Sequence, residues 1–261
     1  MSPLPLSGRR ALVLGASAGI GRATALALAA QGAEIIALAR RVERLEALLP
    51  ELRAAGAPRA TAVLQDLDDR AGLAEAVDGL LADGPIHVLI HNTGGPPGGP
   101  LLGVDGDVLA TFFARHVLTA QLLCQRLVPG MAAEGFGRIV TVTSTSVYEP
   151  IPNLGASNTI RASVAGWAKS LASELPPGVT INNVLPGFTD TERLGSLAAG
   201  RAAKTGTSVD AVREAWLAQV PEGRLIQPEE TAATIAFLCS PAASAIRGVS
   251  LAVDGGRLRG I

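Results

Sequence analysis

The length, composition and charge of the chain exclude several classes of protein. Of its 261 residues, 48% are hydrophobic and 17% are charged, which is far from the composition of disordered proteins. Its 22 basic and 23 acidic side chains give a formal net charge of −1, and neither sign forms a long block, so we expect no nucleic-acid partner. No apolar run reaches the roughly 18 residues of a membrane helix, and the N-terminal segment lacks the order of a signal peptide. We therefore expect a cytoplasmic protein without a membrane partner.

The apolar segments predict alternating strands and helices. Seven short runs have the composition of strands: ALVLG, EIIALA, ATAVL, HVLIHN, RIVTVTS, VTINNVL and VSLAVD. Six stretches between them have helical periodicity, over residues 19–31, 42–55, 70–82, 106–133, 154–175 and 228–240. Strands without polar alternation are buried on both faces. The sequence therefore predicts an α/β fold, a Rossmann-type doubly wound parallel sheet with helices on both faces, in a single domain over residues 1–261.

Residues 191–219 interrupt this alternation. They follow the sixth strand, and they are long, polar and mostly helical. Because ligands of open parallel sheets bind at the carboxyl edge, a helical insertion there is a candidate substrate lid. The alternative is a structural helix pair docked on the domain.

Three glycines follow the first strand and open the next helix. Gly15 turns the chain, while Gly19 and Gly21 let the backbone approach a pyrophosphate and let the helix pack on the strand. The N-terminus of the helix then faces the phosphates. This arrangement predicts a dinucleotide site.

The GxxxGxG spacing of this loop resembles the short-chain dehydrogenase/reductase family, and other motifs agree in order along nearly the whole chain. They are Asp66 after the third strand, Asn92-Thr93-Gly94, Ser144 after the fifth strand, Pro186-Gly187 with Thr191, and Val253-Asp254-Gly255-Gly256. The resemblance implies a nicotinamide cofactor bound by Gly15, Ser17, Gly19, Ile20, Gly21, Arg40, Arg41, Asp66, Leu67, Asn92, Thr93, Gly94, Arg161, Pro186, Gly187 and Thr191.

The end of the second strand decides the choice of cofactor. An acidic side chain there would bind the ribose 2′-hydroxyl of NAD, but this strand ends Ala39-Arg40-Arg41. Arg40 can hold a 2′-phosphate through its planar fork, so NADP is favoured. Alternatively, both arginines are the solvated start of the next helix, and Ala18 counts mildly against NADP because many NADP-using relatives carry a basic residue in the glycine loop.

The catalytic pattern of the family is broken. The family uses a tyrosine and, four residues later, a lysine that lowers its pKa; in this chain those positions are Ser157 and Arg161, and His116 stands where the family has an asparagine. Serine is a far weaker acid than tyrosine. Arg161 keeps a positive charge that can hold ribose hydroxyls, and Ser144 remains to polarise a carbonyl oxygen. Binding can therefore survive while proton transfer is lost or moved.

Two residues are candidates for a relocated proton donor. Tyr148 is the only tyrosine and lies in the loop after the fifth strand, and His116 has an imidazole, whose ordinary pKa of about 6.5 suits a proton relay. The structural alternatives are a rim tyrosine and a helix-packing histidine.

Two functions follow from this pattern. Ser157-Asn158-Thr159-Ile160-Arg161 with Gly94-Gly95-Pro96-Pro97 resembles a divergent subgroup of β-ketoacyl-carrier-protein-reductase-like members that lack the complete tetrad. This favours an NADP-dependent oxidoreductase acting on a small-molecule carbonyl or alcohol, with a 3-oxoacyl thioester as one candidate substrate. The alternative is a catalytically impaired NADP-binding sensor or scaffold.

The resemblance also implies a homo-oligomer, a tetramer or a dimer. Cys124 and Cys239 have no CxxC partner, so we expect no metal site and two buried packing residues.

Overall fold

The computed structural model describes residues 4–260 and contains one parallel sheet of seven strands in the order β3-β2-β1-β4-β5-β6-β7. The strands are β1 (Arg10–Leu14), β2 (Glu34–Ala39), β3 (Ala60–Leu64), β4 (Val88–Asn92), β5 (Gly137–Val142), β6 (Val179–Pro186) and β7 (Ser250–Val253). Each predicted strand is present, and the predicted doubly wound α/β fold is confirmed.

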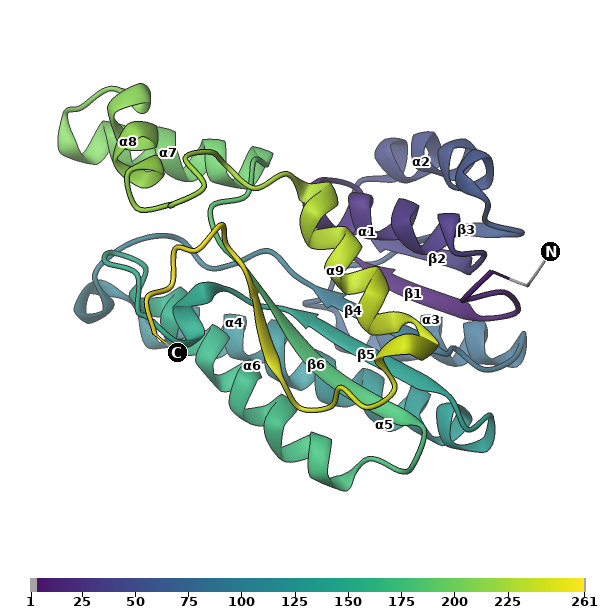
Figure 1. Cartoon of the computed structure of the whole chain (residues 1–261). Helices are drawn as coiled ribbons and strands as arrows, with labels where there is room; N and C mark the ends of the chain where they lie inside the picture. Colours follow the sequence, from purple (N-terminus) through teal and green to yellow (C-terminus); the bar gives the residue numbers. More distant parts are fainter. Residues whose placement is uncertain (1–3, 261) are drawn as a thin grey trace.

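Helices cover both faces of this sheet (Figure 1). On one face lie α1 (Gly19–Ala30), α2 (Val42–Ala55) and α9 (Pro228–Cys239). On the other lie α3 (Arg70–Ala82), α5 (Thr119–Ala133) and α6 (Gly155–Glu174), with α4 (Gly106–Phe113) before α5.

Alternate residues of each strand enter two separate cores. On β1, Ala11 and Val13 pack in the core beneath α1, α2 and α9, whereas Leu12 and Leu14 pack in the core on the opposite face. All four side chains are fully buried. The unbroken apolar run thus follows from burial on both faces, because successive side chains of a strand point to opposite faces of the sheet.

The predicted helix over residues 106–133 is interrupted by a π-helical segment, Ala114–Leu118, which separates α4 from α5. Thr119 Oγ donates a hydrogen bond to the Ala114 carbonyl, 3.2 Å away. The π turn lets one residue bulge without breaking the axis, and sequence periodicity does not reveal it. His116 lies in this segment.

The insertion contains α7 (Glu192–Thr205) and α8 (Val209–Leu217), joined near Gly206. The two helices have a small core of their own, in which Phe188 stacks on Trp216 at 5.3 Å between ring centroids. In Figure 1 they lie apart from the two helical layers, beyond the carboxyl ends of the strands. Within residues 4–260, no helix combines the length and apolarity needed to cross a membrane.

Candidate active site

A cavity of about 1130 Å³ opens at the carboxyl edge of the sheet, between the strand ends and α7. Its volume is slightly above the range for sites that bind one drug-sized molecule, which suits a dinucleotide together with a substrate. Residues that the sequence predicted separately line this one cavity: Gly15, Ser17, Gly19, Ile20, Arg40, Arg41, Asp66, Leu67, Asn92, Thr93, Gly94, Ser144, Ser157, Arg161, Pro186, Gly187 and Thr191. Gly21, His116 and Tyr148 are outside the lining.

The glycine loop between β1 and α1 supplies free backbone donors. Gly15 has φ +64°, which favours glycine, and a Cβ on Gly21 would lie 2.2 Å from the Gly15 carbonyl oxygen. The absence of a side chain at Gly21 therefore lets the start of α1 pack directly against the backbone of Gly15. Ala18 gives α1 no side-chain cap, so amides of its first turn remain available to a ligand. This end of the cavity fits the pyrophosphate of a dinucleotide.

Arginines surround the cavity near the end of β2. Arg41 donates to Ser17 Oγ, 3.1 Å from Nη2, and approaches Glu192 of α7, which also accepts from Arg44 at 2.7 Å. The hydrogen bond from Arg44, followed by that from Arg41, lowers the pKa of Glu192. Arg40 instead turns to Asp66, 3.6 Å away, so Arg41 is the arginine that contacts the glycine loop.

Arg161 lies at the base of the cavity, where β4 and β5 end. Its Nη1 donates to the Val142 carbonyl at 2.6 Å and its Nη2 to the Thr93 carbonyl at 3.5 Å, while its buried Nε has no hydrogen-bond partner within residues 4–260. Burial, reinforced by the neighbouring Arg193, lowers the pKa of Arg161 to about 10. The guanidinium is therefore a fixed cation at neutral pH.

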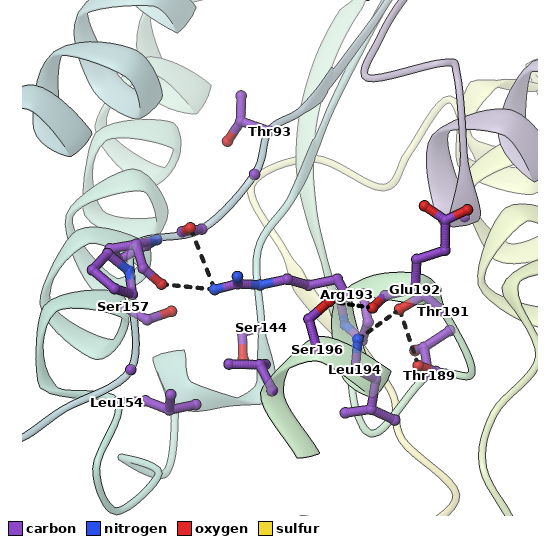
Figure 2. Close-up of a pocket in the computed structure, with 18 of the residues that line it drawn as sticks. Thr93, Ser144, Leu154, Ser157, Thr189, Thr191, Glu192, Arg193, Leu194 and Ser196 are labelled. Atoms are coloured by element: carbon purple, nitrogen blue, oxygen red, sulfur yellow. Dashed lines mark hydrogen bonds between the residues drawn. The ribbon is translucent and has the colours of Figure 1, made fainter. Parts of the chain in front are cut away.

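Two serine hydroxyls lie in the same region (Figure 2). Ser144 Oγ caps the short turn after β5 by accepting from the Ser146 amide at 3.1 Å, which leaves its own proton free to be donated. Ser157 projects from the first turn of α6 into the cavity. Together with Arg161 these groups can hold and polarise an oxygen atom.

Tyr148 does not reach this site, contrary to the hypothesis of a relocated proton donor. Its side chain is 60% exposed, and its hydroxyl donates to the carbonyl of Ser250 on β7, 3.0 Å away. The short 3₁₀ turn Thr145–Val147 directs it toward the sheet edge. The position of Tyr148 in the sequence did not show which way its side chain points.

His116 is not placed to donate a proton in the cavity, contrary to the second hypothesis, because it is buried behind the cavity wall. Its Nε2 lies 3.1 Å from the Gly94 carbonyl, which only accepts, so Nε2 carries the proton and Nδ1 accepts from Thr93 Oγ1 at 2.8 Å. Burial, followed by the charge of Arg161, lowers the pKa of His116 to about 2. The neutral imidazole thus supports the end of β4.

The sequence predicted that the insertion is a candidate lid, but it did not identify which side chains of α7 enter the cavity. Figure 2 shows Arg193 reaching across the cavity, where its Nη2 donates to the Pro96 carbonyl at 2.7 Å and the Gly95 carbonyl at 3.4 Å. Arg201 and Lys204 also line the cavity, and Lys204 Nζ donates to the Gly98 carbonyl at 3.2 Å. Their spacing of eight and eleven residues from Arg193 places all three on one helical face, which was the available signal.

Cys124 and Cys239 are buried, as predicted, and burial raises the pKa of each thiol to about 12. Across the described part of the chain, no group of three His, Cys, Asp or Glu side chains is placed to hold a metal ion.

Comparison with known proteins identifies the class to which this fold and site belong. Residues 15–257 match the family model described as enoyl-(acyl carrier protein) reductase. The 3-oxoacyl-(acyl-carrier-protein) reductase FabG of Vibrio cholerae is 34% identical over 254 residues, which cover 96% of this chain and 98% of FabG. The chain belongs to the short-chain dehydrogenase/reductase family.

Solved structures of the same family agree with this assignment. L-sorbose reductase from Gluconobacter frateurii, complexed with NADPH and L-sorbose, has a TM-score of 0.92 and 28% identity, and the match covers 100% of both chains. A point variant of actinorhodin polyketide ketoreductase with NADPH has a TM-score of 0.89 and 30% identity, covering 95% of this chain and 97% of that one.

The buried neutral state of His116 predicts an acid sensitivity of the fold. Below pH about 6.5 the unfolded chain binds a proton at this residue, whereas the folded chain does not, so stability falls as the pH falls. When the pH is lowered from 7 to 5, both proteins should lose unfolding free energy. We expect this loss to be about 2 kcal/mol smaller in His116→Gln than in the unmodified protein. Urea denaturation at both pH values measures this difference, and equal losses in the two proteins would contradict the assignment.

Proposed function

We propose that this protein is an NADP-dependent oxidoreductase that reduces a carbonyl or oxidises an alcohol at an atypical centre formed by Ser144, Ser157 and Arg161. One observation carries the proposal. A single cavity contains both a glycine loop, followed by a helix whose N-terminus has no side-chain cap, and this cluster of two hydroxyls and a cation. The NADPH complexes of two related structures support the choice of cofactor.

The residues around the cavity fit NADP along its length. The amides of the glycine loop and α1 would hold the pyrophosphate, and Arg41 with Ser17 would hold the 2′-phosphate, because β2 ends in arginines and not in the acidic residue that binds the ribose of NAD. When bound, the cofactor donates or accepts the hydride. Thr93, Pro186 and Thr191 also line the cavity, and Thr191 lies against Gly19 of the glycine loop.

The protein's own part in the reaction is to polarise and orient oxygen. Ser144 would donate a hydrogen bond to the carbonyl oxygen, and the fixed charge of Arg161 would stabilise the negative charge that develops there. The described residues lining the cavity include neither tyrosine nor histidine. In our proposal the alkoxide therefore takes its proton from water that reaches it past Ser157, and the low acidity of the serine does not prevent turnover.

Replacing the polarising hydroxyl tests this centre. We expect Ser144→Ala to lower kcat by about 100-fold or more, because it removes a donor to the developing oxyanion. Tyr148→Phe serves as the control and should leave turnover unchanged, since its hydroxyl contacts Ser250 outside the cavity. The measurement is NADPH oxidation, followed by absorbance, with ketones and 3-oxoacyl thioesters. Thermal stabilisation by NADPH without turnover of any compound would instead favour the sensor or scaffold.

Arg41 is expected to select NADP over NAD. Loss of a charge-assisted contact to the 2′-phosphate in Arg41→Gln should raise the KM for NADPH by roughly 10-fold to 100-fold and leave that for NADH nearly unchanged. Arg44→Gln is the matched control, because it removes the shorter contact to Glu192 and spares the contact to Ser17. Steady-state kinetics with both cofactors measures the effect, and a parallel rise for NADPH and NADH would argue against this role.

We also propose a homotetramer. Apolar side chains are exposed on two separate regions: Phe113 and Leu118 around the π turn, and Val249 and Leu251 at β7. Two such regions supply the two kinds of contact that a tetramer of two-fold symmetry needs. Size-exclusion chromatography with light scattering should give a mass close to four times 26.5 kDa, and a monomer would refute the proposal.

A further inference from the structure

The end of the cavity around Ser157 and α7 is lined by cations without acidic partners. Arg161, Arg193, Arg201 and Lys204 all line it, and none of them forms an ion pair with a carboxylate of residues 4–260. The cavity has only two acidic lining residues within the described chain. Both are engaged near the end of β2, where Asp66 contacts Arg40, and Glu192 contacts Arg41 and Arg44. Four positive charges thus remain uncompensated near the proposed catalytic centre.

Two of these cations and one hydroxyl surround a single point in the cavity. A Cβ built on Gly95 would lie 3.3 Å from Arg161 Nη2, 3.9 Å from Ser157 Oγ and 4.0 Å from Arg193 Nη2. These three donors come from α6 and α7, and the glycine in the loop after β4 leaves the space between them open.

The electrostatics of this arrangement favour an anion. Arg161 is buried and anchored on strand carbonyls, so it cannot move away from the guanidinium of Arg193. Two like charges in a partly desolvated cavity repel each other, and an oxyanion between them removes the repulsion and accepts hydrogen bonds from the guanidinium groups. A neutral ligand offers no such gain.

We propose that the substrate carries an oxyanion, a carboxylate or a phosphate, which binds among Arg161, Arg193 and Ser157. This inference rests on the proposed function and specifies its substrate class. Arg193 also holds α7 to the loop through the Gly95 and Pro96 carbonyls, so the anion binds where the lid contacts the floor of the cavity. Arg201 and Lys204 add attraction for the incoming anion from the same helical face.

Matched substrate pairs test the charge requirement. The unmodified enzyme with NADPH is given 2-, 3- and 4-oxo acids (pyruvate, acetoacetate, levulinate) against their methyl esters, and dihydroxyacetone phosphate against dihydroxyacetone. We expect kcat/KM for the charged member of at least one pair to exceed that of its neutral partner by more than 10-fold. The pair showing the preference distinguishes carboxylate from phosphate. Equal or better turnover of the neutral members throughout would overturn the inference.

Arg193 variants separate anion binding from a structural role of the lid. Arg193→Gln should lower kcat/KM for the charged member at least 10-fold more than for its neutral partner, whereas Arg193→Lys should retain most of the preference for the charged member. Arg213→Gln, an exposed charge on α8 outside the cavity, is the control and should retain the preference. If Arg193→Gln lowers kcat/KM equally for charged and neutral partners, Arg193 only holds α7 in place, and its role in anion binding is overturned.

A binding measurement keeps this inference separate from the proposed activity. Calorimetry of the protein at constant ionic strength, titrated with inorganic phosphate and with acetate, should detect binding of at least one anion, weakened 10-fold or more by Arg193→Gln and unchanged by Arg213→Gln. If no compound is turned over but this pattern appears, the proposed function fails and the anion site stands. No binding of either anion, together with no charge preference in turnover, would refute the site.

Discussion

The burial of the strands on both faces is the constraint on which the rest of this molecule depends. Side chains such as Leu12 and Val13 lie side by side on β1 yet enter opposite cores, so helices must cover each face of the sheet. The parallel direction then brings every strand's carboxyl end to one edge. The ends of β1, β4 and β5 meet at that edge and form the cavity floor.

Charge divides this cavity into two parts. At the end of β2, arginines and carboxylates are both present, and Glu192 links the start of α7 to Arg41 and Arg44. Around Ser157 only cations are present, and Arg193, the next residue of α7, turns to the opposite wall. Two adjacent residues of α7 thus contact two different parts of the cavity, which couples the position of α7 to both the proposed cofactor site and the proposed substrate site.

The structure revises the chemistry expected from the altered catalytic positions. Tyr148 and His116 were proposed because phenol and imidazole are good proton donors, but the first contacts Ser250 and the second is enclosed behind Thr93. What remains in the cavity is a pair of hydroxyls and a buried guanidinium. Such a set stabilises negative charge on oxygen better than it donates protons, because Arg161 stays cationic and serine is a weak acid.

The sequence by itself determined the strands, most helix bounds and the residues at the strand ends, because these depend on periodicity and on motifs local in the chain. It also showed that Ser157 and Arg161 replace the family's usual pair. The tertiary structure alone decided the π turn at His116, the direction of Tyr148 and the approach of Arg193 to Gly95. These features depend on the direction of a side chain from its backbone and on contacts between segments about a hundred residues apart. The order of residues in a sequence does not specify either of them.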